Sequence, residues 1–239
     1  MIGVCISGAR GRMGRMLTEL VLAADDLELC AALERPGHPE LGMLLGGRVK
    51  LGDKARAGIQ KSDVLLDFSL PDAVIEHLQI AVDQKKPVVT GTTGFTPEQK
   101  KKIDAAASEV AVVFASNMSL GVYTLSRLTE LAAQALPEHE AAIVEIHHKK
   151  KVDAPSGTAL QLAATVESAG GHQVEISAVR GGDVVGEHQV MFLGPGEQII
   201  LTHRATTREH FCRGAVAAVR FVAGRAPGLY SMADVFKEE

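Results

Sequence analysis

Short apolar runs alternate with amphipathic helical segments through the first half of this chain. The runs have the length of strands that are buried on both faces of a parallel sheet. We expect strands at Ile2–Ser7, Leu27–Leu33, Asp63–Ser69, Pro87–Thr90 and Val110–Ala115. Helical periodicity is found at Arg15–Ala23, Pro71–Val82 and 120–135. This β–α series predicts an α/β protein with a Rossmann-like parallel sheet.

Beyond Pro137 the pattern changes to a run of strands with one helix among them. We expect a strand at 141–148, a helix at 157–169, and strands near 173–180, 187–193 and 197–206. Such a run predicts a smaller α+β domain with a mixed or antiparallel sheet. The helical segment 209–224 is expected to return to the first domain. The predicted domains are residues 1–118 with 215–239, and residues 119–214.

A glycine-rich turn joins the first strand to the first helix and reads Gly8-Ala-Arg-Gly-Arg-Met-Gly14. Glycine in this setting lets the backbone turn tightly and approach a pyrophosphate. The spacing differs from the commoner Gly-x-Gly-x-x-Gly, so a structural turn without a ligand is the alternative. Glu34, about 20 positions farther on, can accept hydrogen bonds from an adenosine ribose. Arg35 can pair with a 2′-phosphate, so we expect both NADH and NADPH to bind unless the two residues form only a solvated charge pair.

Two further loops follow strands of the same predicted sheet. Gly91-Thr-Thr-Gly94 comes directly after the fourth apolar run, at the carboxyl edge where parallel sheets hold ligands. The nicotinamide ribose is a plausible partner, and an ordinary turn is the alternative. Residues 115–118 follow the fifth run and would border the nicotinamide. Thr96-Pro-Glu-Gln99 is a capping box and is expected to be structural.

The stretch from Glu145 to Thr158 carries the candidate chemistry. An apolar strand ends in His147-His148, three lysines follow, and Ser156-Gly157-Thr158 opens a helical pattern. Histidine exchanges protons near neutral pH, and Lys151 can supply a proton or neutralise developing charge. The helix start offers backbone donors, with the Thr158 hydroxyl, to a carboxylate. The alternative is a solvated basic turn.

Composition excludes several classes of protein. The formal net charge is −4, whereas a nucleic-acid-binding protein would usually carry a basic excess. Cys5, Cys30 and Cys212 are scattered within apolar runs, which favours reduced thiols over a disulfide framework or a zinc site. We therefore expect no bound metal. No signal peptide and no apolar run of membrane-spanning length is evident, so a cytoplasmic location without a membrane partner is expected.

The chain resembles the bacterial dihydrodipicolinate reductase family over nearly its whole length. The resemblance is carried by the glycine turn, Glu34-Arg35, Gly91-Thr-Thr-Gly-Phe95, Ser116-Asn-Met-Ser-Leu-Gly121, the block from His147 to Leu160, Arg180-Gly-Gly-Asp-Val-Val-Gly-Glu-His188 and Tyr230-Ser-Met-Ala-Asp-Val235. The His-His-x-x-Lys-x-Asp-Ala-Pro-Ser-Gly-Thr block is specific to that family, whereas the glycine turn is not.

The resemblance implies an NAD(P)H-dependent reductase of the diaminopimelate route to lysine. It would reduce 4-hydroxy-tetrahydrodipicolinate (dihydrodipicolinate) to tetrahydrodipicolinate, with His147 as general acid/base and Lys151 as proton donor. The substrate, a small dicarboxylate, would be held by His148, Gly157 and Thr158. The cofactor would be lined by Gly8, Ala9, Arg10, Gly11, Arg12, Met13, Glu34, Arg35, Gly91, Thr92, Thr93, Ala115, Ser116, Asn117 and Met118. A homotetramer, associated through the second domain, is also implied.

Some features depart from the family pattern or stay open. The segment around Ser168–Val174 is shorter than in some members, which concerns quaternary contacts. Arg10 stands where many members have a small residue, and it either reaches a phosphate or projects into solvent. Residues 36–61 are assigned no chemistry. The competing functions are a dehydrogenase acting on another amino or keto acid, and a non-catalytic redox sensor that binds the dinucleotide without turnover.

Overall fold

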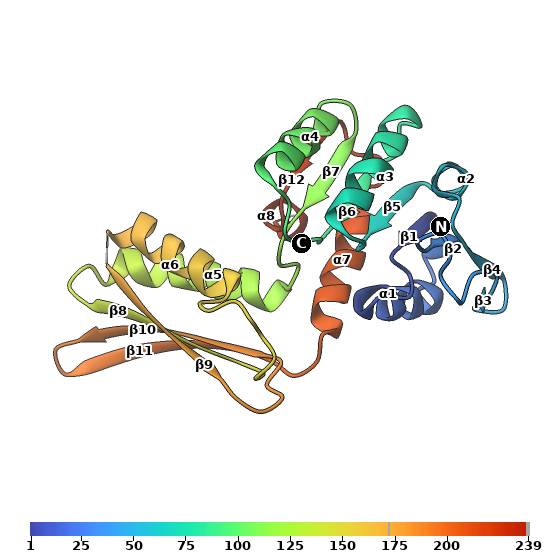
Figure 1. The fold of residues 1–239 in the computed structure, drawn as a ribbon. Helices are drawn as coiled ribbons and strands as arrows, with labels where there is room; N and C mark the ends of the chain where they lie inside the picture. The colour runs from blue at the N-terminus through green and yellow to red at the C-terminus, as the bar shows by residue number, and fades with distance from the viewer. Residues whose placement is uncertain (172, 238–239) are drawn as a thin grey trace. The chain divides into compact units, whose positions relative to one another are not determined.

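The computed structural model describes residues 1–171 and 173–237, which form two compact units (Figure 1). Unit 1 comprises Met1–Met118 and Phe211–Glu239, and unit 2 comprises Ser119–His210. Residue 172, within the segment expected to be short, and residues 238–239, at the end of the first predicted domain, lie outside the described part. No helix in that part is long and apolar enough to cross a membrane.

Unit 1 is built on an eight-stranded sheet in the order β12-β7-β6-β5-β1-β2-β4-β3. All neighbouring pairs are parallel except β3 and β4. The strands are β1 (Ile2–Ser7), β2 (Leu27–Leu33), β3 (Leu44–Leu45), β4 (Val49–Gly52), β5 (Val64–Asp67), β6 (Val88–Thr90), β7 (Ala111–Phe114) and β12 (Gly228–Tyr230). The expected Rossmann-like parallel sheet is confirmed.

Helices cover both faces of this sheet (Figure 1). They are α1 (Arg12–Ala23), α2 (Ala55–Gln60), α3 (Pro71–Asp83), α4 (Pro97–Ala107), α7 (Glu209–Val222) and α8 (Met232–Phe236). One core cluster joins alternate residues of β1 to α1, α7 and α8, and a second joins Cys5 to α2, α3 and α4. Because each strand is buried on both faces, it appears in the sequence as an unbroken apolar run.

Two local predictions about helix starts have different outcomes. Helix α1 begins at Arg12 rather than at Arg15. The turn ends at Gly11, and Gly14, the last glycine of the motif, already lies in the helix. Helix α4 is capped as expected: the Thr96 hydroxyl accepts from the Gln99 N–H, and the Gln99 side chain returns a bond to the Thr96 N–H.

Unit 2 is a four-stranded sheet in the order β11-β10-β8-β9, with two helices on one face. Its elements are α5 (Leu120–Ala135), β8 (Glu140–His147), α6 (Gly157–Gly170), β9 (Val174–Arg180), β10 (Gly186–Gly194) and β11 (Glu197–Ala205). Strands β8 and β9 are parallel and the other pairs antiparallel, so the predicted mixed sheet is confirmed. Burial alternates along β8, and Ala141, Ile143, Glu145 and His147 therefore share the face that α5 and α6 cover.

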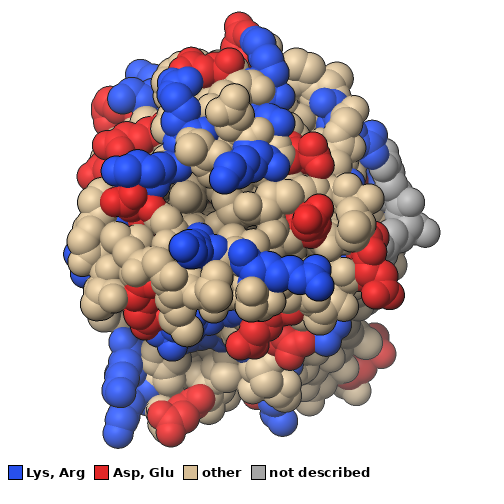
Figure 2. Space-filling view, turned by 90° about the vertical axis from the view of Figure 1, so that its right-hand side faces the viewer, with Lys and Arg blue, Asp and Glu red and all other residues tan. Residues whose placement is uncertain are grey.

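Charged side chains are mixed rather than segregated on one face of the molecule. On the face shown in Figure 2, Lys and Arg lie among Asp and Glu. This distribution agrees with the small net charge of −4. It is unlike the continuous basic surface that binds a phosphate backbone.

Gly214 in α7 provides a test of packing in unit 1. A Cβ at this position would overlap the carbonyl oxygen of Met118. Glycine-to-alanine changes inside a helix ordinarily stabilise it by about 1 kcal/mol, but overpacking costs about 1–3 kcal/mol. We expect Gly214→Ala to lower the free energy of unfolding of unit 1 by about 1–3 kcal/mol, measured by urea denaturation. The matched change Gly52→Ala, which meets no atom within 4 Å, should be nearly neutral; equal effects would contradict the packing argument.

Candidate active site

The glycine turn of unit 1 leaves the start of α1 open to a ligand. Gly8 has a φ of +72°, and a Cβ on Gly14 would overlap the Gly8 carbonyl oxygen, so the helix packs directly against the turn. The N-cap residue Gly11 makes no side-chain capping bond, and no acidic residue occupies the first helical turn. Backbone donors at such a helix start attract phosphate groups.

A cavity of about 500 Å³ lies beside this turn. It is lined by Ser7, Gly8, Gly11, Leu33, Glu34, Arg35, Pro36, Asp53, Ala55, Phe68, Ser69, Leu70, Ala73, Glu76, His77 and Ile80. Within the described residues, the Glu34 Oε2 atom is buried without a hydrogen-bond partner. An unsatisfied buried acceptor is costly, and ribose hydroxyls would supply the missing donors. The cavity therefore fits the adenosine half of a dinucleotide.

His77 is part of the wall of this cavity. Its Nδ1 atom lies 2.7 Å from Asp67 Oδ2 and 3.2 Å from the Ser7 hydroxyl. Burial lowers the pKa of His77, but the hydrogen bond and charge of Asp67 outweigh burial and raise the pKa above its ordinary value. Asp67 is fully buried and also accepts two bonds from Ser69.

The other expected cofactor residues gather at the carboxyl edge of the sheet. The Ala115 N–H donates to the Thr90 carbonyl oxygen at 3.3 Å, which brings the segment 115–118 beside the loop that starts at Gly91. In that loop, the Thr92 hydroxyl donates to the Ser69 carbonyl oxygen at 2.9 Å. The structure thus brings both loops together, as parallel neighbours β6 and β7 require.

Several expected residues have partners within the protein. The Arg10 guanidinium neither points into solvent nor lies free, because it forms an ion pair with Glu40. The Met13 sulfur lies 3.9 Å from the Cys212 thiol. Met118 is buried, with its carbonyl packed against Gly214. Arg12, Arg35, Thr93 and Ser116 are exposed, and Ala9 is buried under the turn.

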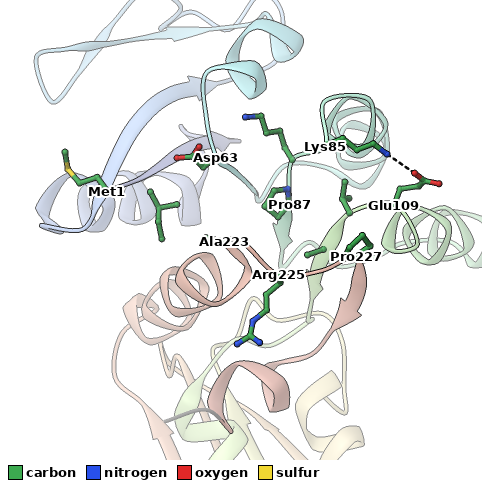
Figure 3. A pocket seen from close by; sticks show the side chains of 13 residues that line it. Met1, Asp63, Lys85, Pro87, Glu109, Ala223, Arg225 and Pro227 are labelled. Carbon is green, nitrogen blue, oxygen red and sulfur yellow. Dashed lines mark hydrogen bonds and ion pairs between the residues drawn. The ribbon is translucent and has the colours of Figure 1, made fainter.

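A second cavity in unit 1, of about 590 Å³, lies at the opposite edge of the sheet (Figure 3). Its lining includes Asp63, Pro87 and Pro227, each of which directly precedes a strand. Lys85 and Glu109 point toward one another there, 2.8 Å apart. Parallel sheets bind ligands at the carboxyl ends of their strands, so the cavity beside Gly8 is the better cofactor site.

In unit 2, the buried carboxylate of Glu145 organises the end of β8. Its Oε2 atom bonds to Nδ1 of His147, and its Oε1 atom accepts from Arg180 Nη2 at 2.6 Å and from the Ser156 N–H at 3.1 Å. Burial raises the pKa of Glu145, but the hydrogen bonds from Arg180 and His147 outweigh burial and hold the pKa below its usual value. Glu145 is therefore ionised at neutral pH.

Two buried imidazoles meet above this carboxylate. The rings of His147 and His188 are 5.1 Å apart and nearly perpendicular, at 73°. Burial, followed by the neighbouring His147, lowers the pKa of His188 to about 4. Burial also lowers the pKa of His147, although Glu145 opposes this shift. Both rings are therefore neutral at pH 7, with His188 Nε2 hydrogen-bonded to the Ser156 hydroxyl at 3.1 Å.

The loop after β8 carries the expected lysine. Lys151 Nζ donates to both carboxylate oxygens of Asp153, at 2.7 and 2.8 Å, and this hydrogen bonding lowers the pKa of Asp153. The positive charge of Lys151 contributes to the lowered pKa of His147, so the two expected catalytic groups interact electrostatically. The pairing of Lys151 with Asp153 was not expected from the sequence.

The expected substrate residues lie around the start of α6. Ser156 is the N-cap, its hydroxyl accepting from the Ala159 N–H at 3.2 Å, and Gly157 is the exposed first helical residue. The first turn of α6 contains no acidic residue. Nearby in the chain, His148 is half-buried and its Nδ1 atom finds no hydrogen-bond partner among the described residues. These donors suit a carboxylate.

Sequence reasoning missed Glu145, Arg180 and His188 as site residues. Alternation along β8 could have placed Glu145 on the same face as His147. No local sequence pattern indicates Arg180 or His188 as a site residue, because both reach the site through strand pairing with β8. Arg180 of β9 lies opposite His147, and His188 of β10 lies opposite Glu145.

The donor set Glu145, His147 and His188 also resembles that of a metal site, since its ligand-type atoms lie within 4.8 Å of one another. However, both carboxylate oxygens already accept hydrogen bonds. The Arg180 guanidinium supplies the positive charge that a cation would bring. Among the described residues this cluster is thus built as a hydrogen-bonded network.

Comparison with known proteins identifies the same family in both units. The family models "Dihydrodipicolinate reductase, N-terminus" and "Dihydrodipicolinate reductase, C-terminus" match residues 2–118 and 121–236. The 4-hydroxy-tetrahydrodipicolinate reductase of Anaeromyxobacter sp. (strain Fw109-5) is 44% identical, over 98% of this chain and 97% of its own. That of Thiobacillus denitrificans is 43% identical, over 98% of both chains.

Solved structures show the same fold. A dipicolinate-bound dihydrodipicolinate reductase from Paenisporosarcina sp. TG-14 superposes with a TM-score of 0.81 at 26% identity, covering 99% of both chains. A DAP dehydrogenase from C. glutamicum, with a TM-score of 0.60 at 13% identity over 97% of this chain and 92% of its own, shares the fold alone. The chain belongs to the dihydrodipicolinate reductase family.

Proposed function

We propose that this protein reduces 4-hydroxy-tetrahydrodipicolinate to tetrahydrodipicolinate, in the diaminopimelate route to lysine. The observation that carries the proposal is the family match, which extends over both units and includes the block from His147 to Thr158. The reaction needs a dinucleotide site, a carboxylate site and a proton donor. Unit 1 offers the first of these, and unit 2 offers the other two.

The substrate site lies at the start of α6. Backbone donors at Gly157 and the hydroxyl of Thr158 would hold one carboxylate of the substrate, and the unpartnered Nδ1 of His148 is available as a further donor. Lys151 and Arg180 surround this region with positive charge. A relative of known structure binds dipicolinate, which is also a small dicarboxylate.

The cofactor site lies at the carboxyl edge of the sheet in unit 1. The Gly8–Gly14 turn would receive the pyrophosphate, Glu34 the adenosine ribose, and the loops at 91–93 and 115–118 the nicotinamide half. NADH or NADPH supplies a hydride when bound there. Glycine and the packing of α1 give the turn its shape, and that shape would orient the bound dinucleotide.

Proton transfer is assigned to His147 and Lys151. Because Nδ1 of His147 is bonded to Glu145, Nε2 is the atom that is left for exchange with the substrate. A Cβ on Gly186 would lie 3.0 Å from this Nε2 atom, so glycine at that position keeps its surroundings open. Loss of the 4-hydroxyl group as water gives the conjugated imine; Nε2 of the neutral His147 would accept the proton that leaves the ring carbon, and Lys151 would supply the proton that leaves with the hydroxyl. Hydride addition to this conjugated imine then leaves an enamine, to which the protonated His147 would return its proton.

Assembly and location are part of the proposal. The face of the unit 2 sheet opposite the helices carries cross-strand apolar neighbours, among them Ala142, Met191 and Ile200, and Ile200 is half-exposed. This face is where four chains would associate. Cys5, Cys30 and Cys212 form no disulfide bond in the described part of the chain, in keeping with a reducing cytoplasm.

A substitution tests the role of His147. We expect His147→Gln to lower kcat about 100-fold or more, as loss of a general acid/base does, while the Kd for NADH changes less than threefold. Burial places the pKa of His147 below the usual histidine value. The change of kcat with pH that is due to His147 therefore lies on the acid side of neutrality. This part of the kcat–pH profile should vanish in the variant. Stopped-flow and steady-state kinetics measure both. An unchanged kcat would remove His147 from this role, and NADH binding without any turnover by the wild type would indicate a redox sensor.

We expect NADH to be used in preference to NADPH. Glu34, Asp53 and Glu76 line the adenosine cavity against the single cation Arg35, and His77 is already paired with Asp67. A 2′-phosphate would add negative charge among these carboxylates. Glu34→Ala should raise the KM for NADH about tenfold, which corresponds to about 1.4 kcal/mol of binding free energy. It should also lower the ratio of kcat/KM with NADH to kcat/KM with NADPH. Glu28→Ala, an exposed change on β2, the strand that ends just before Glu34, should alter neither the KM for NADH nor the preference. A higher kcat/KM with NADPH would contradict this assignment.

The oligomeric state is tested on the outer face of the unit 2 sheet. Ile200→Asp places a charge among apolar neighbours and should reduce the mass of a tetramer, measured by sedimentation equilibrium. Leu131→Asp, at a more exposed leucine on α5 on the helical side of the sheet, is the control and should leave the mass unchanged. A monomeric wild type would exclude the tetramer.

A further inference from the structure

The carboxylate of Glu145 is the most deeply buried charge in unit 2 among the described residues, with none of its side chain exposed. Burying an ionised carboxylate costs several kcal/mol unless it is paired and hydrogen-bonded. Here Arg180, His147 and the Ser156 N–H supply that compensation. Such a costly group persists where it has a task beyond packing, and a neutral side chain of the same size would pack with less penalty.

The bond from Glu145 determines how His147 presents itself. A carboxylate accepts but does not donate, so the Nδ1 atom of a neutral His147 carries the hydrogen. This fixes the tautomer with a free lone pair on Nε2 and prevents the ring from rotating. Strand β8 sets the geometry, because residues two apart point to the same face.

Arg180 connects this pair to the loop that carries Lys151. Its Nη2 atom donates to Glu145 Oε1 and also to the Asp153 carbonyl oxygen, each at 2.6 Å. Asp153 in turn holds Lys151 through two hydrogen bonds. One guanidinium group therefore sets the spacing between the strand end with His147 and the loop with Lys151. The Nη1 atom of the same group donates to the Val179 carbonyl oxygen at 2.8 Å, so two nitrogen atoms hold the guanidinium plane, and lysine has only one nitrogen atom.

We propose that Glu145 and Arg180 are positioning residues of the reductase site: Glu145 holds His147 in one tautomer and orientation, and Arg180 holds Glu145 and the Lys151 loop together. The proposal rests on the proposed function for its kinetic consequences. Its structural consequence, the state of the His147 ring, is independent of turnover.

The charged and titratable groups that face His147 come from several elements. Glu145 on β8 raises the pKa of His147, and Lys151 in the loop and Arg180 on β9 lower it, in addition to burial. His188 on β10 has a pKa of about 4 and is neutral at neutral pH. Removing the charge of Glu145 should therefore lower the pKa of His147 further, whereas a change that only loosened packing would expose the ring and raise its pKa toward the ordinary value.

Glu145→Gln is the first experiment. Histidine ring signals are followed by NMR against pH in the full-length protein, with His147→Gln used to assign the resonance. We expect the pKa of His147 to fall by about one unit and kcat to fall by about 10- to 100-fold, while the Kd for NADH stays within twofold. Asp26→Asn removes another carboxylate that is paired with an arginine, Arg220 in unit 1, and should change none of these.

Two conservative variants separate the roles. Glu145→Asp keeps the charge but is one methylene shorter. Relative to Glu145→Gln, it should bring the pKa of His147 closer to the wild-type value than it brings kcat. Arg180→Lys keeps a positive charge but loses the planar guanidinium that two nitrogen atoms hold in place; it should lower kcat about tenfold while leaving the pKa of His147 within half a unit. Circular dichroism and thermal unfolding establish which variants fold, and Glu145→Asp carries the test if Glu145→Gln does not fold.

The outcomes are distinguishable. A folded Glu145→Gln protein with an unchanged His147 titration and unchanged kcat overturns the positioning role of Glu145. Wild-type kcat in Arg180→Lys overturns the role of Arg180. If the wild type itself does not oxidise NADH with 4-hydroxy-tetrahydrodipicolinate, the proposed function fails. The NMR titration still decides whether Glu145 controls the imidazole.

Discussion

A single buried carboxylate constrains the architecture of unit 2. Glu145 can stay ionised out of water only if donors converge on it, and those donors come from the strand β9, from β8 itself and from the start of α6. The sheet register and the position of the helix must therefore both be correct before the site is stable. The bonds that offset the cost of burial are the same bonds that orient His147.

Unit 1 depends on space rather than on charge. Glycine at positions 8 and 14 lets the chain turn and lets α1 approach the sheet, which leaves a helix start without a side-chain cap facing outward. The adenosine cavity adjoins that start and contains an acceptor, Glu34 Oε2, without a partner among the described residues. The shape of this edge and the unsatisfied acceptor support the proposed cofactor site.

The electrostatics of unit 2 suit a dianionic substrate. Burial keeps both His147 and His188 neutral, so the positive charge near the site comes from Lys151 and Arg180. These cations are themselves held by carboxylates, Asp153 and Glu145. The cations and carboxylates thus hold one another in place, and a neutral imidazole between them can accept or return a proton near physiological pH.

Much of this could be predicted from local sequence. Apolar runs buried on both faces, glycine spacing and the Thr96 capping box are short-range signals, and they correctly indicated the parallel sheet, the second mixed sheet and most helix boundaries. The His147–Thr158 block likewise pointed to chemistry at the end of β8. These features are determined by the sequence because period, capping and chain geometry act within a few residues.

The tertiary structure decided the partners. Arg180 and His188 reach Glu145 and His147 only through strand pairing with β9 and β10, and Arg10 meets Glu40 only because residues 36–61 fold back beside the turn. No local pattern encodes such pairings, since they join residues about 30 or more positions apart in chain order. The sequence by itself specified the strands, helices and reactive side chains, while the long-range hydrogen bonds that set their charge and orientation arose from the register of the folded sheets.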